Sequence, residues 1–324
     1  MHQCQETDVY PAQPAKLESS AGAKPDEVDV KQVGVVGLGD MGSGLAKNLI
    51  ASGFAVSGLD LSEKRMADFV AMGGTAAGSA AEVGVGADAV FVMVMNGNQA
   101  KSVILGDGLV STMKPGSVIL LTATIKAPEA REIGAALTGS GIDLIDSPVS
   151  GGFPGAQGGT LTMMAAGSDD AMEKARPVME AVSGTIHRVG TEPGMGQTVK
   201  ACLQSLIGSI FSATFEASAL AAKAGVPGQV LYDVFSTSGA GCGVANTALE
   251  NIIDGKFEGT GSHINTMYKD LTIAMDMARD LGVPLFTAAS AMQLFQAGKT
   301  KYPDSDNWVV TRIVEDIVGA ELRR

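Results

Sequence analysis

The sequence predicts an α/β fold in which a doubly wound parallel sheet is followed by a long linking helix and an all-α domain. From residue 32 to about residue 190, short apolar runs alternate with amphipathic segments, the pattern of a parallel sheet covered by helices. From residue 196 onward, apolar residues recur at helical spacing and no convincing strand follows. A chain of 324 residues has room for two such domains.

The composition divides the chain into three regions. Residues 1–30 contain three prolines, several acidic residues and no arginine, and they lack the apolar core of a signal peptide. We therefore expect a flexible leader over residues 1–30 and a sheet domain over residues 31–192. A helical substrate and dimerisation domain should occupy residues 193–324.

Seven apolar runs are expected to form the strands, and they cover residues 33–36, 55–59, 89–94, 118–121, 144–145, 161–165 and 186–189. Helices should begin at Ser62, a good N-cap, and near Pro128. Residues 196–222 should form one helix of roughly 40 Å, too apolar for a surface element. Further helices are expected over residues 227–236, 245–253, 263–281 and 284–296.

Charge and cysteine usage exclude several classes of function. The net charge of −12 argues against nucleic acid or an anionic membrane as a partner, and no apolar run reaches the about 20 residues of a membrane span. The three cysteines and three histidines are scattered without metal-ligand spacing, so we expect no metal site. The absence of paired cysteines favours a reducing, cytoplasmic location.

One glycine-rich turn organises the first domain: Gly37-Leu38-Gly39-Asp40-Met41-Gly42, between an apolar run and a helical segment. In this G-x-G-x-x-G pattern, Gly37 permits the tight turn and Gly39 allows a pyrophosphate to approach the backbone. Gly42 allows helix and strand to pack closely, and the free N–H groups of the new helix attract phosphate. The pattern predicts a Rossmann-type dinucleotide site.

An acidic residue at the end of the second predicted strand indicates which dinucleotide binds. Asp60 follows Gly42 by 18 residues, where a carboxylate meets the hydroxyls of the adenosine ribose. A carboxylate there repels the 2′-phosphate of NADP, so Asp60 favours NAD. The alternative is that Asp60 only starts the turn into the next helix.

Two further stretches have the features of a substrate site. Ser150-Gly151-Gly152 follows a predicted strand and offers a hydroxyl and closely spaced N–H groups to a carboxylate, although an ordinary glycine-rich turn explains it equally well. Lys200 and Gln204 lie four residues apart and so share a helix face. Desolvation would lower the pKa of Lys200 toward the range of a general base, whereas a snorkelling surface lysine is the plainer interpretation. Lys269-Asp270-Leu271, considered alone, is typical of a charged helix surface.

Together these motifs resemble the β-hydroxyacid dehydrogenase family, which includes 3-hydroxyisobutyrate dehydrogenase and tartronate semialdehyde reductase. Its four signatures appear in order: the glycine turn, Asp146-Ser147-Pro148-Val149-Ser150-Gly151-Gly152, Gly194-Met195-Gly196 leading to Lys200, and Lys269-Asp270-Leu271. The resemblance implies that Lys200 is catalytic and that Ser150, Gly151 and Gly152 hold the substrate carboxylate. It places Met95, Asn96 and Thr124 beside the cofactor, which Lys269 reaches from the second domain. It also implies a homodimer or homotetramer.

Differences from the family pattern bear on the substrate. Gln204 replaces the usual Asn, and Ala123 replaces the usual Ser. The features that resemble the L-threonate dehydrogenase branch are Gln204, Asp60, Val94-Met95-Asn96 and Glu192-Pro193-Gly194. Leu203 and Cys242, expected to face the substrate, differ from that branch. The resemblance therefore implies NAD-dependent oxidation of a small, anionic hydroxy acid, with an L-threonate-type four-carbon sugar acid favoured. The alternatives are a 3-hydroxyisobutyrate dehydrogenase, a reductase of a short semialdehyde and, remotely, a non-catalytic dinucleotide-binding scaffold.

Overall fold

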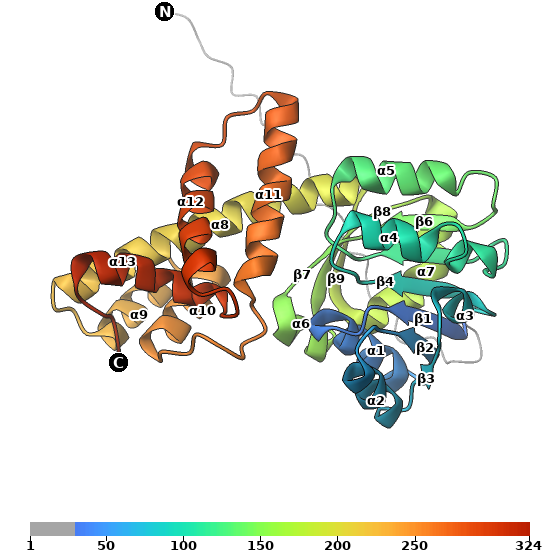
Figure 1. The fold of residues 1–324 in the computed structure, drawn as a ribbon, viewed down its shortest axis with the longest axis horizontal. Coiled ribbons are helices and arrows are strands. Elements are labelled where there is room, and N and C mark those ends of the chain that lie inside the picture. The colour runs from blue at the N-terminus through green and yellow to red at the C-terminus, as the bar shows by residue number, and fades with distance from the viewer. Residues whose placement is uncertain (1–29) are drawn as a thin grey trace, which may run out of the picture.

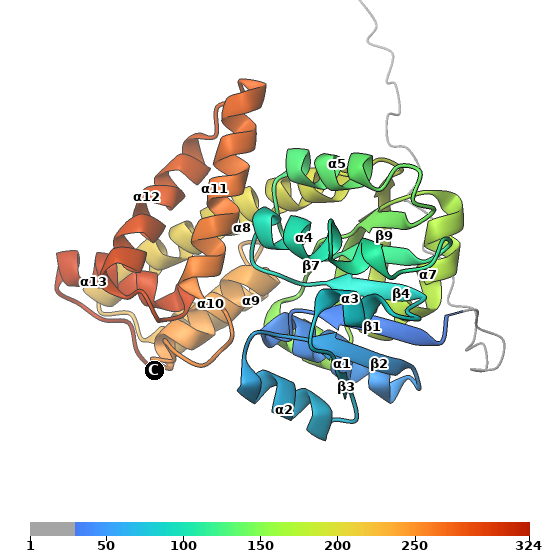
Figure 2. The same cartoon turned by 45° about the vertical axis from the view of Figure 1, so that its right-hand side comes forward.

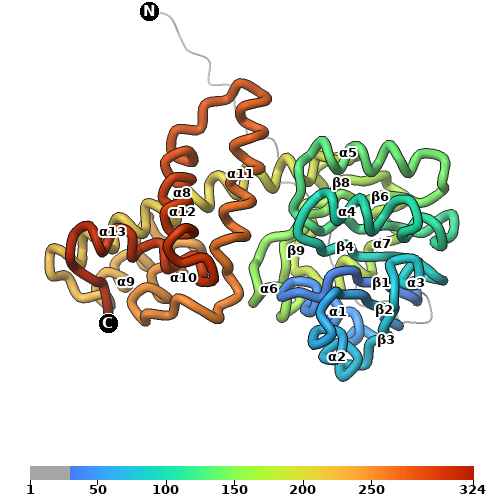
Figure 3. The backbone as a smooth tube through the Cα atoms, viewed as in Figure 1, coloured from blue at the N-terminus to red at the C-terminus, as the bar shows by residue number. Residues whose placement is uncertain are grey.

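A computed structural model describes residues 30–324, which form a sheet covered by helices and an assembly of helices beside it (Figure 1). Helix α8 (Met195–Lys223) runs from the sheet into the helical part, as the tube in Figure 3 shows. The predicted leader, residues 1–30, lies outside the described residues except for Val30, which is buried against the sheet.

The first six strands of the sheet are parallel and lie in the order β3-β2-β1-β4-β5-β6. This is the strand order of a dinucleotide-binding doubly wound sheet. The strands are β1 (Gln32–Val36), β2 (Ala55–Leu59), β3 (Thr75–Ala76), β4 (Ala89–Val92), β5 (Val118–Leu121) and β6 (Asp143–Asp146).

Beyond β6 the sheet is no longer purely parallel. Strand β8 (Leu161–Ala166) runs antiparallel to β6 and to β7 (Val149–Ser150), while β9 (Ser183–Gly190) is parallel to β8. All seven predicted strands are present. The two additional strands, β3 and β7, contain two residues each, which is too short for a recognisable apolar run.

Helices cover both faces of the sheet because successive strand residues point to opposite sides. Val33 and Val35 pack into the core under α1 (Asp40–Ala51), α2 (Glu63–Ala71), α6 (Gly152–Gly158) and α7 (Asp169–Val182). Val36 packs into the core under α3 (Ala80–Gly84), α4 (Gly97–Ile104) and α5 (Ala127–Ala136). Figure 2 shows α4 and α5 on one side of the sheet and α1 and α2 on the other.

The helical part is built around α8. The other helices are α9 (Gly228–Thr237), α10 (Gly243–Ile253), α11 (Ile264–Leu281), α12 (Phe286–Lys301) and α13 (Thr311–Val318). Its core contains an aromatic cluster in which Phe211 stacks on Phe215 and meets the edge of Trp308. Helix α13, which has eight residues, was not among the predicted helices.

Helix α8 is not wholly internal, which corrects the expectation from its apolar sequence. Its exposed side includes Leu206, which is 57% exposed, and Leu220, which is 72% exposed. By length and composition alone it could cross a membrane, a test that core helices of soluble proteins also pass. Its other side buries polar residues, among them Lys200 and Gln204.

Candidate active site

The glycine turn between β1 and α1 has the shape that a bound pyrophosphate needs. Gly37 has a φ of +91°, and a Cβ there would lie 2.3 Å from the Met93 carbonyl oxygen. A Cβ on Gly42 would lie 1.8 Å from the Gly37 oxygen, so both positions exclude side chains. A Cβ on Gly39 would have the Arg65 guanidinium, at 3.7 Å, as its nearest neighbour. The backbone at Gly39 is therefore open to a ligand at the N-terminus of α1.

Asp60 holds this turn in place. Its Oδ2 accepts a hydrogen bond from the Leu38 N–H (2.7 Å), and its Oδ1 accepts one from the Ser62 N–H (2.9 Å). Arg65 lies 3.9 Å from the same carboxylate. Asp60 thus links the end of β2 to the glycine turn, and its contact with the ribose stays a prediction.

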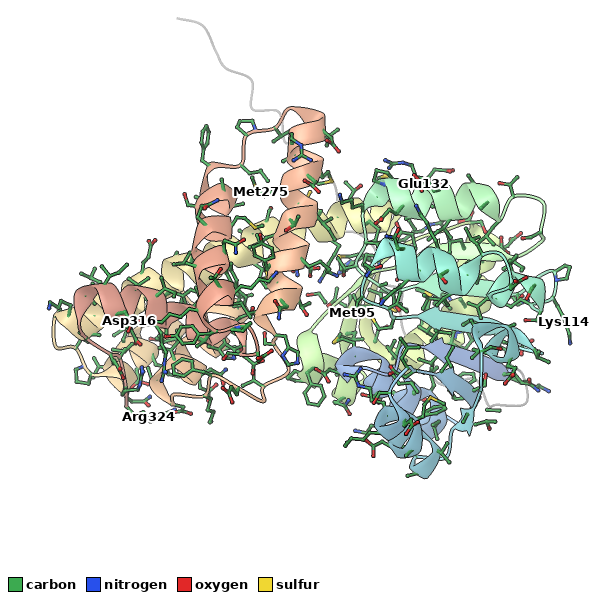
Figure 4. All side chains as sticks on the ribbon, viewed as in Figure 1. Met95, Lys114, Glu132, Met275, Asp316 and Arg324 are labelled. Atoms are coloured by element: carbon green, nitrogen blue, oxygen red, sulfur yellow. The ribbon has the colours of Figure 1, made fainter. Side chains whose placement is uncertain are left out.

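The residues predicted beside the cofactor follow β4 and β5. Asn96 is the N-cap of α4, where its Oδ1 accepts a hydrogen bond from the Gln99 N–H (2.9 Å). Met95, labelled in Figure 4, lies at the junction of the two parts. The carbonyl oxygens of Met95 and Thr124 both accept hydrogen bonds from Lys269 Nζ, at 3.3 and 2.8 Å. Lys269 therefore reaches from α11 to the carboxyl edge of the sheet.

Ser150, Gly151 and Gly152 form the connection between β7 and α6. Gly151 and Gly152 have φ values of +130° and +60°, which residues with a Cβ rarely adopt. Successive N–H groups in such a turn can face one anion, and Gly151 and Gly152 carry no side chains of their own. The geometry is compatible with the predicted carboxylate cradle.

Lys200 is buried beside this cradle, with 6% of its surface exposed. Its Nζ donates a hydrogen bond to the carbonyl oxygen of Val149 (2.8 Å), the residue before Ser150. Burial lowers the pKa of Lys200; the charge of Asp270 opposes this shift and that of Lys269 adds to it. The snorkelling interpretation is wrong, because the amine points into the protein.

Gln204 lies one turn further along α8 and is held by a buried carboxylate. Its Nε2 donates a hydrogen bond to Oδ2 of Asp270, which is 3% exposed and whose Oδ1 lies 3.1 Å from Lys269 Nζ. A carboxylate only accepts hydrogen bonds, so the amide nitrogen of Gln204 faces Asp270 and its oxygen faces away. The expectation of a charged surface at Lys269-Asp270-Leu271 is therefore wrong for Asp270 and Leu271. Their spacing from the buried Met267 and Ala274 is the signal that could have indicated it.

Comparisons with known proteins show the family of the chain. Residues 32–190 match the NAD binding domain of 6-phosphogluconate dehydrogenase, and residues 194–314 match a domain described as NAD-binding of NADP-dependent 3-hydroxyisobutyrate dehydrogenase. The chain is 38% identical over 288 residues to L-threonate dehydrogenase of Escherichia coli O6:H1, covering 88% of this chain and 95% of that one. The chain belongs to the β-hydroxyacid dehydrogenase family.

Other relatives have different substrates in their names. The chain is 34% identical over 302 residues to an NAD-dependent L-serine dehydrogenase of Pseudomonas aeruginosa, covering 90% of this chain and 100% of that one. The crystal structure of 3-hydroxyisobutyrate dehydrogenase from Salmonella typhimurium superposes with a TM-score of 0.81 at 36% identity, covering 87% of this chain and 99% of that one. As a β-hydroxyacid dehydrogenase, this protein is an NAD-dependent enzyme acting on a CH–OH group of a small acid.

Two buried residues without a predicted role fasten α8 of this dehydrogenase to the sheet. Asp146, at the end of β6, accepts hydrogen bonds from the N–H groups of Gly194 (2.7 Å) and Gln197 (3.2 Å). The Gln197 side chain donates to Asp146 (2.8 Å) and to the Ala123 carbonyl oxygen (3.0 Å), and accepts from the Ile125 N–H (3.0 Å). Burial raises the pKa of Asp146, and the hydrogen bonds from Gln197 and Gly194 oppose that shift. This network fixes the first turn of α8, directly before Lys200.

The two residues expected to distinguish the substrate lie on different helices. Leu203 is half-buried on α8, one turn after Lys200. Cys242 is exposed at the N-cap of α10, and no hydrogen bond among the described residues joins it to Lys200 or to the cradle. Its contact with the substrate stays a prediction. Within residues 30–324, no three His, Cys, Asp or Glu side chains come together as a metal site would require.

Proposed function

We propose that this enzyme oxidises the C2 hydroxyl of an L-threonate-type four-carbon sugar acid, with Lys200 as the general base. The observation that supports it best is the hydrogen bond from Lys200 Nζ to the Val149 oxygen, because it holds a buried amine beside the carboxylate cradle. Burial lowers the pKa of Lys200, which increases the fraction of neutral amine able to accept a proton.

The carboxylate cradle binds the substrate, and Lys200 takes part in its oxidation. Ser150, Gly151 and Gly152 hold the carboxylate, so that the neighbouring hydroxyl carbon lies near Lys200. The neutral amine of Lys200 takes the hydroxyl proton as the C–H bond breaks. Gln204, whose amide oxygen faces away from Asp270, accepts a hydrogen bond from a substrate hydroxyl.

NAD supplies the acceptor for the hydride that leaves the carbon. The turn Gly37–Gly42 fits its pyrophosphate, because Gly39 leaves the backbone open to a ligand. A side chain at Gly37 or Gly42 would clash with the backbone of the protein. Asp60 would bind its adenosine ribose, and Met95, Asn96 and Thr124 would line its nicotinamide end. Lys269 connects this edge to the helical part and holds Asp270 in place beside it.

The choice of substrate rests on the relatives and on Gln204. Relatives called L-threonate dehydrogenase are 34–38% identical to this chain. Leu203 and Cys242 differ from that branch and favour a smaller or less polar substrate, so 3-hydroxyisobutyrate oxidation or reduction of a short semialdehyde is the second candidate. A non-catalytic scaffold is disfavoured, because the buried lysine and its partners are all present.

A substrate panel tests the proposal. The purified enzyme with NAD is offered L-threonate, D-glycerate, L-serine, 3-hydroxyisobutyrate and 3-hydroxypropionate, and NADH formation is measured. The expected result is the highest kcat/KM for L-threonate. A higher kcat/KM for 3-hydroxyisobutyrate would replace the proposed substrate by the second candidate, and no turnover of any acid would contradict both.

We also propose that two copies of this chain associate through α8. Three exposed apolar residues of this helix, Val199, Leu206 and Leu220, are spaced by seven and fourteen residues and so form one stripe. Such a stripe on a long helix suits a second helix of the same kind. Light scattering after gel filtration tests this proposal. The wild type should have the mass of a homodimer or homotetramer, and the double variant Leu206→Glu, Leu220→Glu should have the mass of a monomer.

We propose a sheet domain over residues 31–192 and a helical domain over residues 193–324, in a cytoplasmic protein. Limited proteolysis tests the boundary, since cleavage should concentrate near residue 192. Fractionation of the source cells tests the location.

A further inference from the structure

The loop that leads into α11 carries a histidine across to the glycine turn. His263 Nε2 lies 3.2 Å from Oδ2 of Asp40, the first residue of α1. The two residues are 223 positions apart in sequence and belong to different parts of the structure. Beside them, Gly261 of the same loop packs so closely on Phe153 of α6 that a Cβ there would lie 2.6 Å from the phenylalanine Cβ.

A buried carboxylate lies on the Nδ1 side of the histidine ring. Asp306 is 1% exposed, and its Oδ2 accepts hydrogen bonds from the backbone N–H (2.7 Å) and hydroxyl (2.8 Å) of Thr260. Its Oδ1 lies 3.6 Å from His263 Nδ1 and has no hydrogen-bond partner within residues 30–324. Trp308 Nε1 donates to the Thr260 hydroxyl (2.9 Å), which fixes the loop further. The ring therefore presents Nε2 to the first turn of α1.

One charge in the first turn of α1 opposes the binding of a pyrophosphate there. Free N–H groups and the helix dipole attract the pyrophosphate to the N-terminus of α1, but Asp40 adds a carboxylate to that same turn. A carboxylate there repels a diphosphate. His263 is the basic side chain that faces this carboxylate, and with an N–H on Nε2 it can donate to either anion.

We propose that His263 is a cofactor-binding residue supplied by the helical part, donating a hydrogen bond from Nε2 to the pyrophosphate of NAD. Asp40 competes with the pyrophosphate for this N–H, and Asp306 keeps the ring aimed at the turn. The proposal rests on NAD binding at Gly37–Gly42 and not on the identity of the substrate. It makes the helical part contribute to cofactor affinity as well as to catalysis.

Binding measurements on two variants test the proposal, because their effects should have opposite signs. His263→Ala should raise the Kd for NADH, measured by fluorescence titration, about tenfold, the scale of one hydrogen bond to a charged group. Asp40→Asn should lower the Kd about threefold, since it removes a like charge at the phosphate. ADP-ribose, measured by competition, should show the same changes as NADH because it contains the pyrophosphate but no nicotinamide.

The alternative is that the contact between His263 and Asp40 only holds the helical part against the sheet domain. In that case either substitution breaks the same contact, so both would change the Kd in the same direction, and that result would overturn the proposal. An unchanged Kd in both variants would overturn it as well. His263→Gln, which retains an N–H donor on a more flexible side chain, should give an intermediate Kd and provides a second variant should His263→Ala fold poorly. His187→Ala, exposed on β9, is the matched control and should bind NADH like the wild type.

Discussion

Lys200 on α8 donates a hydrogen bond from Nζ to the carbonyl oxygen of Val149, which directly precedes the Ser150-Gly151-Gly152 turn. This contact joins the helical part to the end of β7, and it determines where the amine lies relative to a carboxylate held by the turn. Burial lowers the pKa of this amine, and the charge of Asp270 opposes the shift while that of Lys269 adds to it.

Removing the Lys200 amine should abolish catalysis without preventing cofactor binding. Lys200→Met keeps the apolar stem and should reduce kcat by about two to four orders of magnitude, the usual contribution of general acid–base catalysis. The Kd for NADH should change less than threefold, because Nζ contacts the Val149 oxygen rather than the glycine turn. Lys223→Met, at the exposed end of the same helix, is the control and should retain wild-type kcat. Turnover of Lys200→Met near that of the wild type would contradict the role of this lysine.

The pH dependence of kcat should report the charge of Asp270. Lys200 accepts a proton only as the neutral amine, so kcat should rise with pH through its pKa, which burial lowers below the ordinary lysine value. The negative charge of Asp270 raises this pKa, so Asp270→Asn should move the rising limb to lower pH. The measurement is kcat at saturating substrate across pH for both proteins. A limb that stays in place or moves to higher pH would show that another group controls it.

Cofactor choice should depend on Asp60. The wild type should have a far higher kcat/KM with NAD than with NADP, because a carboxylate at the ribose repels the 2′-phosphate. Asp60→Asn should raise the NADP-to-NAD ratio of kcat/KM at least about tenfold, since it removes the repulsion and frees Arg65, 3.9 Å away, to pair with the phosphate. Adding Arg65→Ala should cancel the gain. Comparable kcat/KM for both cofactors in the wild type would mean that Asp60 only stabilises the glycine turn and does not select the cofactor.

Much of the fold could be predicted because local signals determine it. The runs at Val33–Val36 and Ala55–Leu59 are apolar, short and bounded by turn residues, and Ser62 caps its helix as its position suggested. Glycine positions such as Gly37 and Gly42 carry a steric requirement that any sequence with this turn must meet. Such features need no knowledge of distant parts of the chain.

The rest depended on contacts between distant residues. Whether Asp270 is exposed depends on which face of α11 packs on α8, and its hydrogen bond to Gln204 spans 66 positions. The buried environment of Lys200 likewise arises where the start of α8 meets the sheet. The contact between His263 and Asp40 could not be predicted either, because it requires the helical part to fold back onto α1.

The hydrogen bonds of Gln197 should position Lys200 rather than merely stabilise the fold. Gln197→Leu leaves Asp146 Oδ1, the Ala123 oxygen and the Ile125 N–H without this partner, so the start of α8 should shift relative to the sheet. We expect kcat to fall about tenfold, the scale of one misplaced group, with the Kd for NADH unchanged within threefold. The rising limb of the pH profile should also move, because a displaced lysine is differently buried. Thr198→Val, which removes only a bond within the same helical turn, should keep the wild-type profile. A lowered Tm with unchanged kcat and pH limb in Gln197→Leu would assign this residue to stability alone.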